Sequence, residues 1–260
     1  MKSAILNIKY VLFPAACIAF AINASAKTQF PDSTFKRANK LYLEKKFGEA
    51  VTAYESIIRT GHQTSEVYFN LGNAHYKTGN YAAAILNYER AKKLNPSDED
   101  IDFNLRLVNL NTIDKIEPAP QVFYVKWWND FVNSSSIRDH SQKGLLFIWV
   151  AFVVACFFVL INNSTIKRIT FFAAAVLLIA GLFTVFLARK QFRDMNERKS
   201  AIIFSSGAYI KSSPDENSIN LFMLHAGTRV DVLDELQNWK RIRIANGNEG
   251  WIPADAIEII

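Results

Sequence analysis

The chain has 260 residues, 50% of them apolar, and carries a formal net charge of +6 at neutral pH. This length allows two modest domains, and the apolar residues are concentrated in runs rather than spread evenly. The two cysteines, Cys17 and Cys156, both fall in apolar runs, which excludes a disulfide framework. The basic residues form no stripe interleaved with aromatic residues. Nucleic-acid binding is therefore not expected, and a location beside a membrane explains the excess of positive charge.

Residues 1–26 have the pattern of a secretory signal peptide. Basic residues begin the segment, residues 10–22 form an apolar centre, and residues 24–26 (Ala-Ser-Ala) form a small-residue cleavage site. We therefore expect this leader to be removed and the residues after it to be exported. Two alternatives stay open: the segment remains as an uncleaved anchor, or it is a lipoprotein leader in which Cys17 is modified.

Residues 31–98 are similar to themselves at a shift of 34 residues. The second copy begins at Ser65 and resembles the tetratricopeptide (TPR) pattern. The matching residues are Leu71, Gly72, Gly79, Tyr81, Ala84, Tyr88, Ala91, Leu94 and Pro96. In this pattern Gly72 and Ala84 are small because two antiparallel helices approach closely there, and Pro96 ends the second helix. The sequence thus predicts an all-α TPR helical repeat.

The first copy is more diverged but keeps the same phase. Residues 99–112 continue it, because Phe103 follows Phe69 and Phe35 at the same spacing. No second helix of a third repeat follows, and residues 113–121 contain the proline and polar residues of a linker. We predict that the TPR array covers residues 31–112 and ends in a capping helix.

The TPR resemblance also indicates a binding groove, because the first helix of each repeat lines a concave surface in that fold. The positions facing it hold Asn39, Phe69, Asn70, Asn73, Lys77 and Asn104. An asparagine side chain both donates and accepts hydrogen bonds, which suits an extended peptide backbone. We predict that this groove binds a peptide segment of a partner protein. Alternatively, the asparagines are only solvated and the phenylalanines only pack between repeats. The carboxylate clamp of some TPR proteins is represented only in part, since its paired lysine and arginine do not occur at the matching places.

Two uncharged apolar runs, residues 144–161 and 169–188, are each long enough to cross a bilayer. The short connection, residues 162–168, predicts an antiparallel transmembrane hairpin. Because two spans return the chain to its starting side, the segments before and after the hairpin are expected to face the same compartment.

Residues 122–143 precede the hairpin and are rich in aromatic side chains. Phe123, Trp127 and Phe131 recur at helical spacing, which predicts a short helix lying in the interfacial zone of the membrane. An aromatic docking site for a membrane partner is the alternative.

The orientation of the hairpin rests on the leader. A cleaved leader places the array in the periplasm, whereas basic residues flank both spans and would, if anything, favour the opposite orientation. We give the leader more weight because it commits the array to export first. The expected location is the inner (cytoplasmic) membrane, with both flanking domains facing the periplasm.

From residue 199 to residue 260 the apolar pattern changes from helical to alternating. Strands are expected over residues 201–204, 208–211, 228–235, 239–244 and 250–253. The segments Leu-His-Ala-Gly-Thr (224–228), Asn-Trp-Lys-Arg-Ile (238–242) and Gly-Trp-Ile-Pro (250–253) resemble a bacterial SH3-like domain, which implies an all-β barrel. The expected interior consists of Val230, Val232, Leu233, Ile242, Ile244, Ile252 and Ile257.

Aromatic side chains of this domain are the candidates for its binding face, namely Tyr209, Trp239 and Trp251. Domains of the family often bind cell-wall peptides or protein segments, for which aromatic platforms are suited. The alternative is that Trp239 and Trp251 are chiefly structural.

No constellation of residues indicates catalysis. The four histidines lie in different modules, none has metal-ligand spacing with another ligand, and no phosphate-binding glycine loop or nucleophile elbow occurs. Cys156 lies inside an apolar run, which makes it a poor nucleophile. We expect a protein that is not an enzyme and has no metal or cofactor.

The order of a leader, two TPR units, a linker, a Trp-Trp segment, an apolar hairpin and an SH3-like tail resembles the BatE family of the Bacteroides aerotolerance operon. The resemblance implies a membrane-anchored scaffold in an envelope-stress or aerotolerance complex. Its implied partners are a MoxR-type ATPase system and membrane proteins with von Willebrand A domains. The competing hypothesis is a cell-wall tether or envelope sensor whose SH3-like domain holds peptidoglycan.

Overall fold

A computed structural model describes residues 32–120, 122–197 and 199–260, so the predicted leader lies outside the described residues. The described chain divides into two compact units. One is Ile137–Lys190, and the other joins residues 32–136 to Gln191–Ile260. The sections before and after the hairpin therefore belong to one unit.

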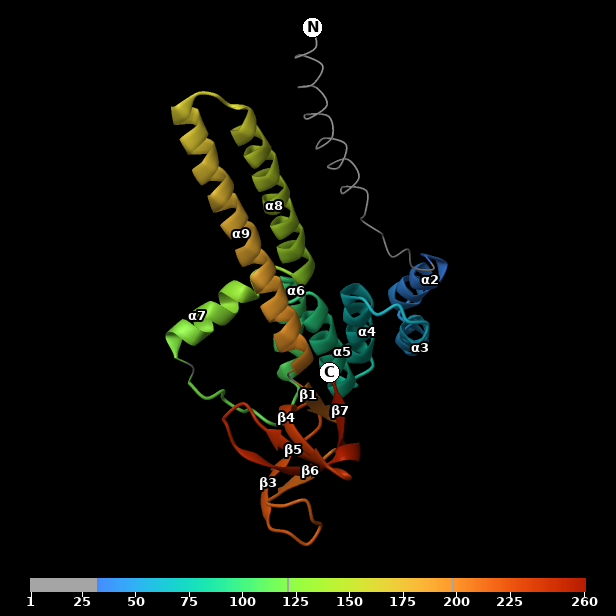
Figure 1. The fold of residues 1–260 in the computed structure, drawn as a ribbon. Coiled ribbons are helices and arrows are strands. Elements are labelled where there is room, and N and C mark those ends of the chain that lie inside the picture. The colour runs from blue at the N-terminus through green and yellow to red at the C-terminus, as the bar shows by residue number, and fades with distance from the viewer. Residues whose placement is uncertain (1–31, 121, 198) are drawn as a thin grey trace. The chain divides into compact units, whose positions relative to one another are not determined.

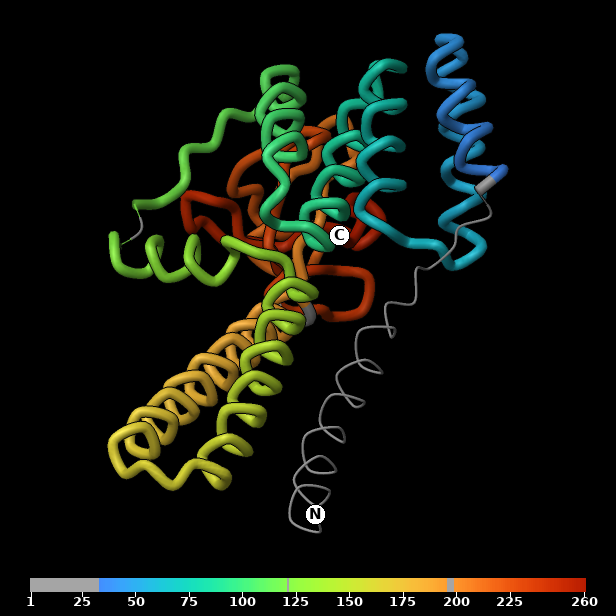
Figure 2. The backbone as a smooth tube through the Cα atoms, turned by 90° about the horizontal axis from the view of Figure 1, so that it is seen from above, coloured from blue at the N-terminus to red at the C-terminus, as the bar shows by residue number. Residues whose placement is uncertain are grey.

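Five helices in the described N-terminal section form the repeat array, which we define as residues 32–109 (Figures 1 and 2). They are α2 (Asp32–Leu43), α3 (Phe47–Arg59), α4 (Ser65–Lys77), α5 (Tyr81–Leu94) and α6 (Glu99–Asn109). Side-chain caps begin the later helices, since Thr64, Asn80 and Asp98 accept hydrogen bonds from backbone N–H groups of the first turns. The predicted TPR helical region is confirmed.

The close approach of α4 and α5 depends on Gly72. A Cβ atom added at Gly72 would lie 2.7 Å from Cδ1 and Cε1 of Tyr88, whose side chain is buried. Gly79 takes a φ of +79° at the turn between the helices, a conformation that glycine adopts without steric cost. The small residues of the repeat thus serve packing and the turn, as the sequence indicates.

The last helix, α6, caps the array because its outer side is polar. At the position where the preceding repeat has Gly72, α6 carries the exposed Arg106, which leaves no room for another closely packed helix. Asp102 on α6 forms an ion pair with Lys92 of α5. A polar outer face of this kind keeps the end of a repeat stack in water.

The hairpin consists of α8 (Ile137–Leu160) and α9 (Ser164–Glu197), and both helices extend beyond the predicted spans into polar flanks. Within the described residues, these are the helices long and apolar enough to cross a membrane, with mean hydropathies of 2.5 and 2.6 over their most apolar windows. They approach closely at Gly144 and Gly181, because a Cβ atom at Gly181 would lie 3.2 Å from the carbonyl oxygen of Gly144. Before the hairpin, α7 (Phe123–Val132) is a short helix with exposed aromatic side chains.

Residues 199–260, which we call the C-terminal domain, form a seven-stranded antiparallel sheet of order β3-β2-β6-β5-β4-β1-β7. The strands are β1 (Lys199–Ile203), β2 (Ala208–Lys211), β3 (Asn220–Leu224), β4 (Arg229–Leu236), β5 (Trp239–Arg243), β6 (Glu249–Pro253) and β7 (Ile257–Ile259). The predicted strands correspond to β1, β2, β4, β5 and β6, whereas β3 and β7 are not in the prediction.

The prediction that Leu233 belongs to the core of this domain is wrong. Leu233 is 39% exposed, because the pairing of β4 with β5 shifts between Val232 and Asp234 and interrupts the in-out alternation there. The other predicted residues are buried or half-buried, and the core also includes Ala201, Ile203, Ala208, Ile210 and Leu224.

Replacing Gly72 by alanine is expected to lower the free energy of unfolding by about 1–3 kcal/mol, because the new methyl group overlaps the Tyr88 ring in a filled core. The measurement is thermal unfolding of the full chain in mild detergent, followed by circular dichroism. Gly48→Ala is the control, since no atom lies within 4 Å of a Cβ there, and it should leave stability equal or slightly higher. Equal melting temperatures for both variants would contradict the close packing of α4 and α5.

Candidate protein-binding surfaces

The predicted groove asparagines form a ladder that repeats with the array. Asn39 Oδ1 accepts hydrogen bonds from Tyr54 Oη (2.6 Å) and Asn70 Nδ2 (3.4 Å). One repeat later, Asn73 Oδ1 accepts from Tyr88 Oη (2.8 Å) and Asn104 Nδ2 (3.0 Å). The structure therefore brings these asparagines together in pairs, each pair joining the first helices of successive repeats.

The ladder provides acceptors for buried hydroxyl groups and leaves other amide atoms unused. The buried tyrosine hydroxyls need acceptors, and burial raises the pKa of Tyr54 to about 12, so the hydroxyl remains a donor at neutral pH. Only one oxygen or nitrogen of each asparagine is used in these bonds. The amide nitrogens of Asn39 and Asn73 and the carbonyl oxygens of Asn70 and Asn104 stay available for a ligand.

The phenylalanines differ along the groove. Phe69 packs on Tyr88 with ring centroids 5.9 Å apart, as Phe35 does on Tyr54 at 6.2 Å. Phe103 has no corresponding tyrosine because a second helix does not follow α6, and it is 58% exposed. Lys77 is exposed, with its ammonium 6.0 Å from the centroid of the Tyr76 ring. Phe103, which is outside the predicted set, is thus the most exposed apolar group at these repeat positions.

A second candidate surface is a cavity of about 620 Å³ on the C-terminal domain. Two residues of the predicted binding face, Tyr209 and Trp239, line it together with Pro253. Trp251, the third residue of the predicted binding face, does not line the cavity and pairs across the sheet with Lys211 and Arg241. The sequence prediction did not include the other polar residues of the cavity, which are Lys211, Glu216 and Asp255.

The lining residues of this cavity carry a net negative charge. The Lys211 ammonium donates to the backbone carbonyls of Glu216 (2.7 Å) and Ser218 (3.3 Å), which shapes the loop between β2 and β3. Among the described residues, the carboxylates of Glu216 and Asp255 have no ion-pair partner. Two aromatic rings and two unpaired carboxylates suit a ligand with an ammonium or guanidinium group.

The array and the C-terminal domain are joined through Asp114, in the segment predicted as a linker. Its carboxylate accepts hydrogen bonds from the His225 backbone nitrogen (2.6 Å) and the Thr228 hydroxyl (2.6 Å), and Nδ1 of His225 lies 2.8 Å away. Further along, the Ala119 nitrogen donates to the Ala245 carbonyl at 2.9 Å. The segment is therefore bound along the domain rather than acting as a free tether.

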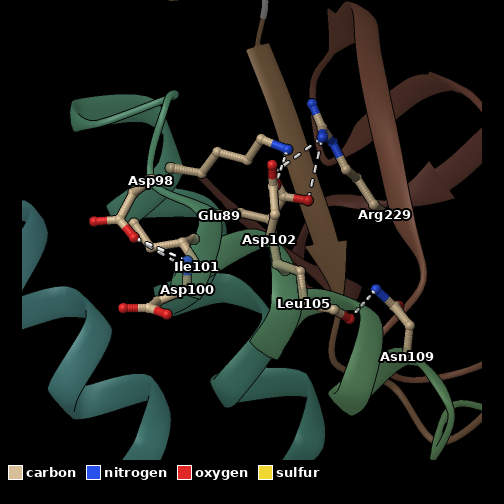
Figure 3. A network of polar contacts seen from close by, with 9 residues as sticks. Glu89, Asp98, Asp100, Ile101, Asp102, Leu105, Asn109 and Arg229 are labelled. Carbon is tan, nitrogen blue, oxygen red and sulfur yellow. Dashed lines mark hydrogen bonds and ion pairs between the residues drawn. The ribbon is translucent and has the colours of Figure 1, made fainter. Parts of the chain in front are cut away.

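Ion pairs add to this interface. Arg229 of β4 reaches both carboxylate oxygens of Glu89 on α5, at 3.0 and 3.1 Å (Figure 3). Arg90 of α5 bonds Glu258 at 3.0 Å and the carbonyl of Ile259 at 2.7 Å. The Glu89 side chain is largely buried, so its pair with Arg229 is better shielded from water than an ordinary surface pair.

Apolar packing completes the interface. Ile202 of β1 is fully buried within the core cluster of the array, among residues such as Ile85 and Leu105. Phe204, Ala226 and Ile260 pack against the same cluster. Burying one such aliphatic side chain contributes about 1.5–3 kcal/mol. The C-terminal domain thus packs against the apolar core of the array.

The pKa of Asp114 lies below its ordinary value. Burial alone would raise it, but the hydrogen bonds from Thr228 and His225 stabilise the charged form and outweigh the burial. In the array, burial lowers the pKa of His75. Among the described residues no cluster of histidine, cysteine and carboxylate groups could hold a metal ion.

Two family models match the chain. The model described as tetratricopeptide repeat matches residues 65–98, and the model described as bacterial SH3 domain matches residues 206–258. The predicted TPR and SH3-like regions are therefore confirmed, and both families are typical of binding modules without catalytic activity.

Comparison with curated proteins found no match. Among solved structures, the type III secretion chaperone SycD of Yersinia enterocolitica, in complex with a peptide of the translocator YopD, is 14% identical with a TM-score of 0.31. The match covers 61% of this chain and 97% of that chain. Another SycD structure is 13% identical over 56% of this chain and 86% of that chain, with a TM-score of 0.30. A similarity at these TM-scores does not indicate a shared function.

Replacing Asp114 by alanine is expected to lower the melting temperature of the full chain by about 4–8 °C, equivalent to about 2 kcal/mol, because it leaves the donors of His225 and Thr228 unpaired. The effect depends on pH. A carboxylate with a lowered pKa stabilises the fold above its unfolded pKa of about 3.9 and loses this contribution as the pH falls through the folded pKa. The difference between wild type and variant should therefore be full at pH 7 and shrink in acid. A difference that is constant from pH 7 to pH 3 would contradict the role given to the charge.

Proposed function

We propose that the protein is a non-enzymatic, membrane-anchored adaptor that binds partner proteins through its TPR array and its SH3-like domain. The observation that carries this proposal is the direct contact of the two modules around Asp114 and Ile202, which makes them one binding unit. A partner with two suitable segments would then meet both surfaces at once, and its effective affinity would rise without new contacts.

The groove of the array suits an extended internal peptide segment. The free amide groups of the asparagine ladder can pair with a peptide backbone, and the exposed Phe103 offers contact for an apolar side chain. The paired lysine and arginine of a carboxylate clamp do not occur at the matching places, so a C-terminal carboxylate is not the favoured ligand. We propose Asn39, Phe69, Asn70, Asn73, Lys77 and Asn104, with Phe103, as the groove residues.

The cavity of the SH3-like domain suits a basic side chain. Tyr209 and Trp239 supply aromatic faces, and Glu216 and Asp255 supply the opposite charge. A cell-wall peptide carrying a free amino group would fit the same chemistry. The aromatic and acidic lining of the cavity therefore also favours a second candidate function, a tether or sensor that holds peptidoglycan.

The hairpin supports membrane anchoring. Only 11% and 17% of the most apolar windows of α8 and α9 are buried, whereas the core helix of a soluble protein would be mostly buried. The leader pattern supports an inner-membrane location with both modules in the periplasm. The likeness to the BatE family supports a place in an envelope-stress or aerotolerance complex with von Willebrand A domain proteins and a MoxR-type ATPase.

Replacing both cavity carboxylates (Glu216→Gln with Asp255→Asn) is expected to reduce the recovery of partner proteins at least about fivefold, because each lost charge-assisted hydrogen bond costs over 1 kcal/mol. The measurement is quantitative mass spectrometry after purifying the tagged full chain from cross-linked membranes. Asp234→Asn, at an exposed position outside the cavity, is the control and should leave recovery unchanged.

Purified cell-wall sacculi distinguish the two candidate functions in the same set of variants. Suppose that wild type sediments with sacculi and the double variant does not, while protein partners are recovered equally from both. This result would support the peptidoglycan tether and contradict binding of partner proteins by the cavity. If neither assay responds to the double variant, the cavity is not the binding face.

Cysteine labelling tests the common side of the two modules. In a chain with Cys17→Ser and Cys156→Ser, single cysteines are placed at the exposed Gln63 of the array or Asn246 of the C-terminal domain. A membrane-impermeant maleimide should label both positions in intact spheroplasts to the same extent. Protection of both would contradict the periplasmic location, and protection of one alone would contradict the hairpin.

A further inference from the structure

A cavity of about 580 Å³ lies at the end of the hairpin where a short loop joins α8 to α9 (Figure 1). Both helices contribute walls, and the lining residues are Phe158, Ser164, Lys167, Arg168, Phe171 and Phe172. All of them belong to the unit Ile137–Lys190, so the hairpin forms this cavity by itself. None of the surfaces described above uses it.

The lining of this cavity carries two positive charges and no negative one. Lys167 and Arg168 are its charged residues. The sequence has no aspartate or glutamate between Asp139 and Asp194, so no carboxylate lies within the two apolar runs or their loop. Among the described residues, neither cation forms an ion pair or a hydrogen bond through its charged group. Two neighbouring cations that no carboxylate balances indicate an anionic ligand.

The donors around the cavity suit a phosphate group. Nζ of Lys167 lies 5.0 Å from the centroid of the Phe158 ring, on the other helix, and the lysine is half-buried. This cation–π contact restrains the lysine side chain, so less freedom is lost when the ammonium binds an anion. Arg168 is exposed and its guanidinium offers five donors, while Ser164 adds a hydroxyl. A phosphate group is negatively charged and accepts several hydrogen bonds, so it complements this set.

The apolar walls distinguish a lipid from a soluble phosphate compound. Phe158 packs on Phe171 with ring centroids 6.0 Å apart, and Phe171 packs on Phe172 at 5.6 Å. Phe171 and Phe172 remain 55% and 66% exposed, so their rings offer uncovered apolar surface beside the cations. A soluble phosphate would leave this surface uncovered, whereas the acyl chains of a glycerophospholipid would bury it.

The sequence of the hairpin places the two cations at the edge of a bilayer. As helices, the apolar runs 144–161 and 169–188 measure about 27 and about 30 Å, close to the hydrocarbon thickness of about 30 Å. Lys167 and Arg168 directly precede the second run. If the hairpin crosses a bilayer, these side chains therefore lie at the depth of the lipid phosphates, whichever side the loop faces.

We propose that the loop end of the hairpin binds the phosphate group of an anionic glycerophospholipid. Lys167 and Arg168 are its cationic contacts, and the phenylalanines of the cavity contact its acyl chains. A zwitterionic headgroup would bring a further positive charge to the same place, so an anionic headgroup is favoured. The lipid source rests on the membrane anchoring of the proposed function, but the proposal needs neither the partner proteins nor the periplasmic orientation.

The test is a lipid titration of the purified full chain in an uncharged detergent, with bound lipid counted by native mass spectrometry. Wild type should bind phosphatidylglycerol at least about tenfold more tightly than phosphatidylcholine with the same acyl chains, because two cations face the headgroup. Lys167→Gln with Arg168→Gln should weaken phosphatidylglycerol binding about tenfold or more, because charge-assisted hydrogen bonds are lost. Arg37→Gln with Lys40→Gln removes the same charge from exposed positions on α2 and should keep the wild-type affinity.

The other outcomes of the titration would overturn the proposal. Displacement of phosphatidylglycerol by an excess of glycerol 3-phosphate or inorganic phosphate would show a site for a soluble compound. Equal binding of the two lipids, or of phosphatidylglycerol to both double variants, would show lipid held by apolar contact alone. Equal helix content by circular dichroism would confirm that the variants are folded. Because the titration uses neither partner proteins nor membrane sidedness, its failure would leave the binding and labelling results above unchanged.

Discussion

The structure depends on one interface, in which the C-terminal sheet covers the apolar side of the last helices of the array. Ile202 lies in the array core, and Asp114 accepts hydrogen bonds from the strand entry of the C-terminal domain. A repeat array needs a cap at each end, because each repeat buries its apolar face against the next. Here α6 provides part of the cap with its polar outer side, and the sheet provides the rest.

This interface changes how the two modules work together. Two domains on a flexible linker would bind partners almost independently, with an effective concentration set by the linker length. A shared core instead fixes the distance between the asparagine ladder and the SH3-like cavity. Under the proposed function, a partner would have to present its two segments at a matching spacing, and the interface would add selectivity as well as affinity. The apolar hairpin is inserted between the halves of this unit in sequence, which requires both ends of the hairpin to return to it.

Features with a local or periodic signal could be predicted from the sequence. The repeat period of 34 residues predicted the pairs of helices. It also predicted equivalent positions for the asparagines that the structure joins in a ladder, namely Asn39, Asn70, Asn73 and Asn104. The uncharged runs gave the long apolar helices. What the spacing could not reveal is that Tyr54 and Tyr88 use the oxygens of two of these asparagines, because such bonds depend on packing between helices.

Features that depend on distant contacts could not be predicted. Asp114 and Thr228 are 114 positions apart, and nothing near Asp114 in sequence distinguishes it from a solvated linker residue. Strand β3 is missing from the prediction because Leu221, Phe222 and Met223 show no alternation, and β7 because it has only three residues. Glu216 and Asp255 line the same cavity only because the sheet brings a loop and a short helix together there.

The distance between the array and the C-terminal domain in the membrane-embedded full chain tests the central claim most directly. Spin labels at Glu66 on α4 and at Asn246 in the turn between β5 and β6, with Cys17 and Cys156 replaced by serine, allow it to be measured by double electron–electron resonance. One shared unit predicts a single narrow distance distribution, which broadens when Asp114 and Ile202 are both replaced by alanine. A broad distribution in the chain with the interface intact would show two independently moving domains and would contradict the account.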